Sequence, residues 1–302
     1  MRTLSEIESV HLAAISDKNK KLGEETAQKY GVAFYEDFEE MLKKEKLDMV
    51  SVCVPTSLHH RVAKKCLESK THVLLEKPIT MSLREASSLL QTASKMKVKF
   101  LVGHIERHNP AVKKVKEMID AGDLGKVIAV MARRVGGFPP QIKDADIAVD
   151  LAIHDIDIVN YLLNAKPVEM HLSKRRNHIR DREDSVEFFL KYKDASAYIQ
   201  ANWITPVKIR KLNITGTKGY LEMDYINQKI EFYKTNYEKF LEKTEDFSDY
   251  ILKFSEPDKI DISVAKKEPL KEEILYFLDC ISHGKKIDCG YAVDALRVAL
   301  SK

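Results

Sequence analysis

Short apolar runs alternate with amphipathic stretches along the chain up to residue 104. Apolar runs occur at residues 10–16, 49–55, 72–76 and 99–104, and helical periodicity at residues 20–30, 58–68 and 83–96. Runs that are nearly continuous in Val, Ile and Leu are typical of strands buried on both faces of a parallel sheet. Strand and helix in alternation therefore predict an α/β domain over residues 1–104, doubly wound around a parallel sheet.

After residue 104 the pattern changes to successive strands joined by short turns. Strands are predicted at residues 127–133, 185–192, 195–203, 208–215, 220–224 and 229–233, and helices at 111–120, 151–163, 271–281 and 291–300. The alternation in SVEFFLKY and ASAYIQANW is typical of an antiparallel sheet with one covered face. Residues 105–302 are thus predicted to form an α+β domain with a large, mostly antiparallel sheet. Residues 236–267 are charged and unpatterned, which favours an irregular excursion.

Composition narrows the class of protein. Of the 302 residues, 44% are hydrophobic and 32% charged, which excludes a disordered chain. A net charge of +4 is weak support for nucleic-acid or membrane partners, and no apolar run approaches the ~18–20 residues of a membrane helix. The cysteines form no CxxC pair, which disfavours disulfides and a zinc ribbon; they are Cys53, Cys66, Cys280 and Cys289. We expect a cytoplasmic, enzyme-sized protein.

Glu76-Lys77-Pro78 is one candidate for chemistry, at the carboxyl end of a predicted parallel strand. Ligands bind at that edge of open α/β sheets, and a lysine there can donate to a substrate oxygen. A solvated lysine before a turn proline explains the pattern equally well. The same tight turn makes the Lys77–Pro78 bond a candidate cis peptide.

Asp150 and His154 are a second candidate, because their i, i+4 spacing places both on one helix face. A carboxylate beside an imidazole orients the ring and suits a general base. The competing interpretation is a helix N-terminus capped by Asp150 or Asp155, which the spacing alone slightly favours. Only one histidine occurs locally, and a metal site is therefore disfavoured.

Arg133 and Arg134 end a predicted strand shortly before Asp150 and are candidates for a phosphate, although surface arginines are the commoner explanation. Two further motifs are rejected. In HIERH at 104–108 the glutamate is misplaced for a zinc motif, and Asn109-Pro110 interrupts the helix. GTKG at 216–219 lies between two predicted strands and lacks the helix that follows a phosphate-binding loop.

Taken jointly, these motifs resemble the Gfo/Idh/MocA family of oxidoreductases. The matches, in the family's order, are Asp17 after LAAIS, VCVPTSLHH at 52–60, EKP at 76–78, GHIERHNP at 103–110, the LG-V turn at 124–127, D-x-x-x-H at 150–154 and W…GTKG at 203–219. Each match is weak alone, whereas the ordered set across nearly the whole chain is specific. Within the family the chain looks most like the UDP-N-acetylglucosamine 3-dehydrogenase type.

The resemblance implies a Rossmann-like domain and hydride transfer between a sugar or nucleotide sugar and NAD. By matching position, His154 is the base, Lys77 stabilises the alkoxide and Asp150 orients the pair. The implied cofactor-binding residues are Asp17, Pro55, Thr56, His59, Glu76 and Lys77, and the acidic Asp17 favours NAD over NADP. The implied substrate-binding residues are Arg107, Asn109, Arg133 and Arg134. Lys77, Asp150 and His154 are expected to converge on one cleft.

One feature departs from the family pattern, because its first strand and GxGxxG turn have no match here. Those glycines cradle the pyrophosphate, so we expect reduced NAD affinity and a sequence that starts inside the first βαβ unit. Without that strand, the strands at 10–16 and 49–54 are expected to pair directly. The alternative function is a non-catalytic ligand-binding or regulatory protein on the same fold.

The sheet of the second domain also carries a prediction about assembly. Phe189, Tyr198 and Trp203 alternate with polar residues and supply more apolar area than a monomer normally exposes. We therefore expect a homo-oligomer, a dimer or tetramer, built sheet to sheet.

Overall fold

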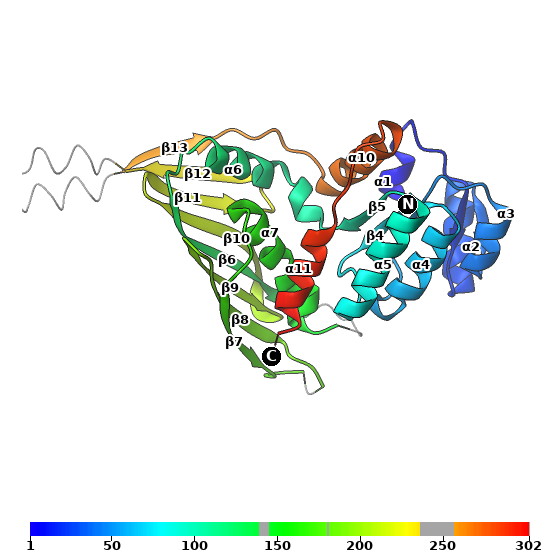
Figure 1. Cartoon of the computed structure of the whole chain (residues 1–302), viewed down its shortest axis with the longest axis horizontal. Helices are drawn as coiled ribbons and strands as arrows, with labels where there is room; N and C mark the ends of the chain where they lie inside the picture. Colours follow the sequence, from blue (N-terminus) through cyan, green and yellow to red (C-terminus); the bar gives the residue numbers. More distant parts are fainter. Residues whose placement is uncertain (139–144, 180, 236–256, 302) are drawn as a thin grey trace, which may run out of the picture. The chain divides into compact units, whose positions relative to one another are not determined.

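The computed structural model describes residues 1–138, 145–179, 181–235 and 257–301 (Figure 1). These residues form two compact units: unit 1 comprises Met1–Ile105 and Glu268–Leu296, and unit 2 comprises Glu106–Lys267 and Arg297–Lys302. Everything after residue 104 was expected in the second domain, whereas residues 268–296 group with unit 1 in the structure. The hydroxyl of Tyr291 donates to Val102 O at 2.9 Å, and this bond helps to hold the segment on unit 1.

Unit 1 is an α/β unit with parallel strands, as predicted. The strands are β1 (Ala14–Ser16), β2 (Ala33–Tyr35), β3 (Met49–Val52), β4 (His72–Glu76) and β5 (Phe100–Gly103), and the helices are α1 (Arg2–Ser5), α2 (Lys20–Tyr30), α3 (Phe38–Lys44), α4 (His59–Glu68), α5 (Leu83–Met96) and α10 (Pro269–Ser282). Val73 and Leu75 of the central strand β4 are fully buried, as a continuous apolar run in a parallel sheet requires.

The expected direct pairing of β1 with β3 is wrong. In the described residues β1 pairs only with β2, whereas β3, β4 and β5 form a separate parallel sheet. Helix α3 contacts both β1 and α4, so the two sheets are joined through the helix layer and not through strand hydrogen bonds.

Unit 2 is built on one eight-stranded sheet in the order β13-β12-β11-β10-β6-β9-β8-β7, mostly antiparallel as predicted. Only β6 and β9 pair in parallel. The strands are β6 (Val127–Gly137), β7 (Glu169–Arg175), β8 (Ser185–Lys191), β9 (Ser196–Asn202), β10 (Ile204–Gly216), β11 (Gly219–Asp224), β12 (Lys229–Lys234) and β13 (Asp258–Ile262). An irregular excursion was expected over residues 236–267, and β13 corrects this expectation for residues 258–262. Residues 236–256 lie outside the described residues.

Helices cover one face of this sheet (Figure 1). α6 (Pro110–Asp120) contacts β12, and α7 (Ile153–Leu163) contacts β6 and β9. The π-helical segment η3 (Ala148–Ala152) precedes α7 directly and contacts β8 and β9. Inward residues such as Phe188 are fully buried, whereas Phe189 next to it is 47% exposed on the opposite face. Alternation along the strand thus separates a core face from an open face.

Candidate active site

The carboxyl ends of the parallel strands of unit 1 carry the residues predicted to bind a cofactor. Asp17 follows β1, Pro55 and Thr56 follow β3, and Glu76 ends β4. The carboxylate of Asp17 accepts the Asn19 N–H at 2.8 Å through Oδ1, while Asn19 caps α2. The second oxygen of Asp17 makes no hydrogen bond within the described part of the chain. An acidic group presented at a strand end fits the ribose diol of a dinucleotide.

The Glu76-Lys77-Pro78 turn has the local geometry that the sequence predicted. The Lys77–Pro78 peptide bond is cis, which confirms that prediction. The Lys77 N–H donates to Glu76 Oε2 at 3.2 Å, so the glutamate side chain folds back over the turn.

His59 ties this turn to the neighbouring strand end. Its Nδ1 lies 2.7 Å from Pro78 O, and its Nε2 lies 3.0 Å from Val54 O. The ring is 1% exposed, and each nitrogen faces a backbone carbonyl, which can only accept. His59 therefore fixes the two loops, and its contact with a cofactor stays a prediction.

Glu273 is a residue of unit 1 that the sequence reasoning missed. It is 1% exposed on α10 and lines a cavity of about 90 Å³ together with Cys53, Glu76 and Gly103. Its Oε1 has no hydrogen-bond partner among the described residues. Burial, with the nearby charge of Glu76, raises the pKa of Glu273 to about 8.

Gly103 lies close to the backbone of β4 and to that carboxyl group. A Cβ at this position would lie 3.3 Å from Leu75 O and 3.5 Å from Glu273 Oε2. The signal in the sequence was a glutamate within the apolar stripe of α10, beside Leu270, Ile274 and Phe277. A charged residue at a core position of a helix is the kind of exception that marks a special environment.

Asp150 and His154 lie where the π-helical segment η3 passes into α7. Local π-helical turns are frequent at functional sites. The helix start is held by Asp146, whose Oδ1 accepts the N–H groups of Ala148 and Val149 at 2.9 and 3.0 Å. Asp146, and not Asp150 or Asp155, is thus the residue that caps this segment. Asp150 and His154 belong to unit 2 and Lys77 to unit 1, so their convergence on one cleft stays a prediction.

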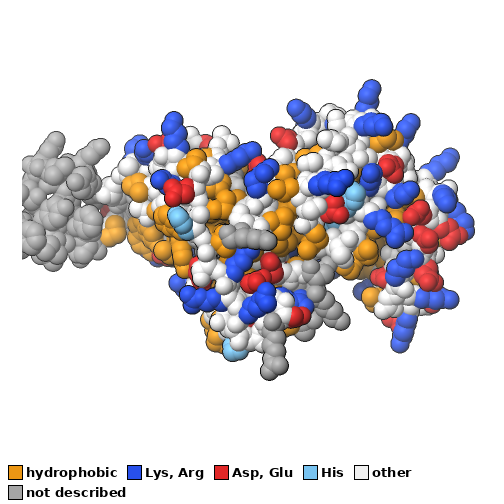
Figure 2. Space-filling view, turned by 60° about the horizontal axis from the view of Figure 1, so that its bottom comes forward, with side chains coloured by type: hydrophobic (Ala, Val, Ile, Leu, Met, Phe, Trp, Pro, Cys, Tyr) orange, Lys and Arg blue, Asp and Glu red, His pale blue; other side chains and the backbone are white. Residues whose placement is uncertain are grey.

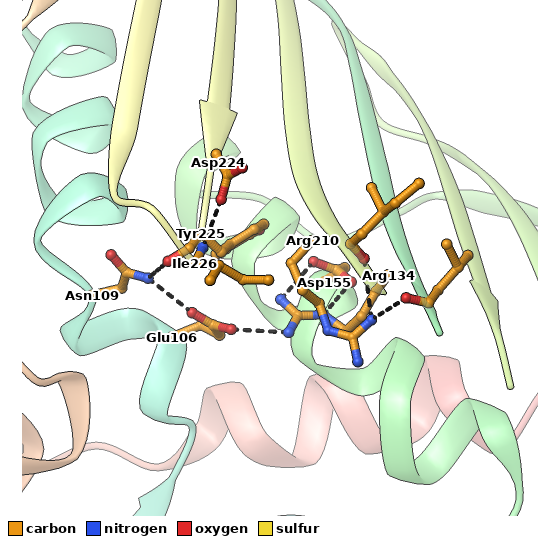
Figure 3. A network of polar contacts seen from close by, with 10 residues as sticks. Glu106, Asn109, Arg134, Asp155, Arg210, Asp224, Tyr225 and Ile226 are labelled. Carbon is orange, nitrogen blue, oxygen red and sulfur yellow. Dashed lines mark hydrogen bonds and ion pairs between the residues drawn. The ribbon is translucent and has the colours of Figure 1, made fainter. Parts of the chain in front are cut away.

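Arg134 lies inside a carboxylate network of unit 2 (Figure 3). It is 4% exposed; its Nε and Nη2 donate to Asp155 at 2.6 and 3.1 Å, and its Nη1 donates to Glu106 at 2.9 Å. Burial alone would lower the pKa of Arg134, but Asp155 and Glu106 raise it above its usual value. Every nitrogen of this guanidinium is therefore already committed to the protein's own carboxylates.

Arg133 and Arg134 were both predicted to contact substrate, and their side chains lie on opposite faces of the sheet. They are neighbours on β6, and successive side chains of a strand point to opposite faces. Arg133 is exposed, whereas Arg134 faces the helices and is buried. The two guanidinium groups therefore cannot close on a single phosphate pair.

The other two predicted substrate residues also have partners within unit 2. Arg107 donates to both oxygens of Asp157 at 2.7 and 2.8 Å. Asn109 caps α6 by accepting the Ala111 N–H, and it donates to Glu106 and to Tyr225 O. Both residues keep a fixed position, and their contact with substrate stays a prediction.

Arg210 is the second residue that sequence reasoning missed. It pairs with Arg134 across β10 and β6 and lies on the same face of the sheet. Its Nη1 donates to Val135 O at 2.8 Å and to Ile209 O at 3.1 Å, and both acceptors are neutral backbone groups. Burial, followed by the charge of Arg134, lowers the pKa of Arg210 to about 10.

Two classes of feature are absent from the described residues. They contain no group of three or more His, Cys, Asp or Glu side chains that could hold a metal ion. Across the same ranges, no helix is both long and apolar enough to cross a membrane.

Family models match most of the chain. Residues 2–104 match the oxidoreductase family model with an NAD-binding Rossmann fold, and residues 112–222 match the GFO/IDH/MocA C-terminal domain. The chain is 27% identical over 223 residues to UDP-N-acetylglucosamine 3-dehydrogenase of Acidithiobacillus ferrooxidans, covering 74% of this chain and 69% of that protein. It is 33% identical over 168 residues to scyllo-inositol 2-dehydrogenase (NAD(+)) of Bacillus subtilis, covering 54% of this chain and 49% of that protein.

Solved structures show the same fold. The structure of UDP-N-acetylglucosamine 3-dehydrogenase from Acidithiobacillus ferrooxidans aligns with a TM-score of 0.82 at 24% identity, covering 96% of this chain and 88% of that one. A putative NADPH-dependent oxidoreductase from Desulfitobacterium hafniense aligns with a TM-score of 0.86 at 22% identity, covering 99% and 89%. At these identities the likeness concerns the fold alone.

Proposed function

The chain belongs to the Gfo/Idh/MocA oxidoreductase family, and on that premise we propose that it oxidises a hydroxyl group of a sugar or nucleotide sugar with NAD. The C3 hydroxyl of UDP-N-acetylglucosamine is the substrate group we favour, because a relative bearing that activity matches 74% of the chain. The observation that carries the proposal is the Asp150–His154 pair, presented by a π-helical turn on the helix-covered face of the large sheet.

The residues at the strand ends of unit 1 fit a nicotinamide dinucleotide. Asp17 would bind the adenosine ribose, and its negative charge would repel a 2′-phosphate, which favours NAD over NADP. Pro55, Thr56 and Glu76 follow neighbouring parallel strands and would line the same edge, with Glu76 toward the second ribose. When bound, NAD supplies the acceptor for the hydride that leaves the substrate carbon.

The protein's own groups would handle the proton and the developing charge. The imidazole of His154 would take the proton of the substrate hydroxyl, and the carboxylate of Asp150 would orient the pair. The Lys77 ammonium, fixed by the turn around Pro78, would stabilise the alkoxide oxygen. Each role needs a group that is held in place, which the capped start of η3 and the His59 tie provide.

We also propose a homo-oligomer that uses the open face of the eight-stranded sheet. Cross-strand pairing brings Phe189, Tyr198 and Met131 into one row on that face. Phe189 and Met131 are 47% and 50% exposed. In Figure 2 hydrophobic side chains reach the surface in patches between lysine and arginine side chains.

Replacement of His154 tests the proposed chemistry. His154→Ala should lower the rate of NADH formation from UDP-N-acetylglucosamine about 100- to 10,000-fold, since a general base contributes that much. NAD binding, followed by quenching of protein fluorescence, should stay nearly unchanged. The matched control is His283→Ala, an exposed histidine after α10. Equal turnover in wild type and His154→Ala would remove His154 from the mechanism.

A further inference from the structure

Arg210 differs from its neighbour Arg134 in having no acidic partner. Within the described residues Arg134 forms ion pairs with Asp155 and Glu106, whereas no ion pair reaches Arg210. Only Nη1 of Arg210 donates, and it donates to the carbonyls of Val135 and Ile209 (Figure 3). The Nε and Nη2 donors have no acceptor in the described part of the chain. Neither nitrogen is among the buried side-chain atoms that lack a partner, so both donors are accessible to water and to an anion that would replace it.

Strand β6 carries no side chain at the position beside the two arginines, and Lys208 of β10 borders that position. Gly136 follows Arg134 by two positions on β6 and therefore lies on the same sheet face. A Cβ at Gly136 would meet nothing nearer than 3.8 Å, at Lys208. The strand thus presents no side chain beside the two arginines, although Gly136 itself is buried.

A second unused donor lies at the bend between β9 and β10. Ala201 of β9 pairs with Arg134, and Trp203 comes two positions further along the chain. Trp203 is 4% exposed, and its Nε1 has no hydrogen-bond acceptor among the described residues. The segment η3, which contains Asp150, contacts β9 next to this end of the sheet. The charge of Asp150 also tends to raise the pKa of Arg210.

We propose that Arg210 binds a negatively charged oxygen group of the substrate, a phosphate or a carboxylate, and thereby selects charged sugars over neutral ones. The guanidinium offers Nε and Nη2 as a parallel pair of donors, the geometry that both anions accept. This inference rests on the proposed function, because it concerns the substrate of the same site. The guanidinium nitrogens of Arg134 all bond to carboxylates, whereas Arg210 keeps two donors available.

Binding measurements on the intact chain test this assignment without turnover. Calorimetry compares UDP-N-acetylglucosamine, which carries a diphosphate, with glucuronic acid, which carries a carboxylate, and with neutral N-acetylglucosamine. Wild type should bind at least one charged probe about 10- to 100-fold more tightly than the neutral probe, and Arg210→Met should lose that preference. The probe that loses affinity identifies the anion. Trp203 is the only tryptophan, so a change in its fluorescence on binding places the probe at this end of the sheet.

The matched control is Lys211→Met, which removes one positive charge from the adjacent, exposed position on the opposite face of β10. An equal loss of affinity in both variants, or an equal affinity of wild type for charged and neutral probes, overturns the assignment. The wild-type comparison needs no variant, so an equal affinity for charged and neutral probes overturns the assignment even if Arg210→Met does not fold. Charge preference without oxidation of any sugar would refute the proposed function while leaving the role of Arg210 intact. Oxidation of neutral and charged sugars at equal efficiency would support the proposed function and refute the role of Arg210.

Discussion

Glu273 gives the sharpest prediction about stability, because a carboxyl group with a free oxygen is buried in unit 1. Its pKa rises from 4.5 to about 8 through burial and the nearby Glu76. Between these two pH values the folded protein holds a proton that the unfolded chain releases. The folded state therefore binds more protons, and the free energy of unfolding falls as the pH rises across this window.

The size of the effect follows from the shift in pKa. A rise from 4.5 to about 8 corresponds to at most about 5 kcal/mol of stability lost on the alkaline side. Glu273→Gln keeps the shape of the side chain and removes its ionisation. The variant should match wild type at a pH of about 4.5 and exceed it above a pH of about 8, because only wild type then carries a buried charge.

Urea unfolding, monitored by circular dichroism at a pH of about 4.5 and at a pH of about 8 or above, measures the free energy of unfolding of variant and wild type. Subtracting the free energy of unfolding of wild type from that of the variant cancels the contributions of other groups that titrate over the same pH interval. Glu25→Gln is the control, since Glu25 lies exposed in the middle of α2. A difference between Glu273→Gln and wild type that does not change with pH would show that Glu273 ionises normally in the folded protein.

Three further predictions concern the network, the cofactor and the assembly. Arg134→Met should lower the free energy of unfolding by about 3–5 kcal/mol in urea titrations, because Asp155 and Glu106 lose their shared cation; a loss near zero would show that water or another group replaces it. Asp17→Ala should weaken NAD binding about tenfold and reduce the ratio of NAD affinity to NADP affinity, both measured by calorimetry. An unchanged ratio of the two affinities would show that Asp17 does not select the cofactor. Light scattering at micromolar concentration should give the mass of a dimer or tetramer, and a monomer would contradict assembly through the sheet.

The elements that could be predicted are those whose burial shows as a pattern of apolar residues in the sequence. β4 could be recognised because Val73 and Leu75 are buried on both faces of a parallel sheet. β13 could not, because four of its five residues are exposed and its order comes from pairing with β12. The separation of β1 from β3 could not be predicted from the sequence either, because strand pairing depends on contacts between elements distant in sequence.

The candidate site shows the same division. The cis bond at Lys77–Pro78 was foreseen from a local turn. The burial of Arg134 was not, because its partners Asp155 and Glu106 lie 21 and 28 positions away. Alternation along β6 tells that Arg133 and Arg134 face opposite sides, but not which of them enters the core. Arg210 became a candidate only once its pairing with Arg134 was known.

An isotope label on the substrate carbon tests whether this protein transfers a hydride from a sugar to NAD. The protein and NAD are incubated with UDP-N-acetylglucosamine that carries deuterium on C3, or with inositol deuterated on its ring carbons. The mass of the recovered NADH is then measured by mass spectrometry. With wild type we expect NADH that carries the deuterium from one of these substrates. With His154→Ala we expect no deuterated NADH. Unlabelled NADH, or no NADH although NAD and a sugar both bind, would contradict hydride transfer and would favour a ligand-binding protein on the same fold.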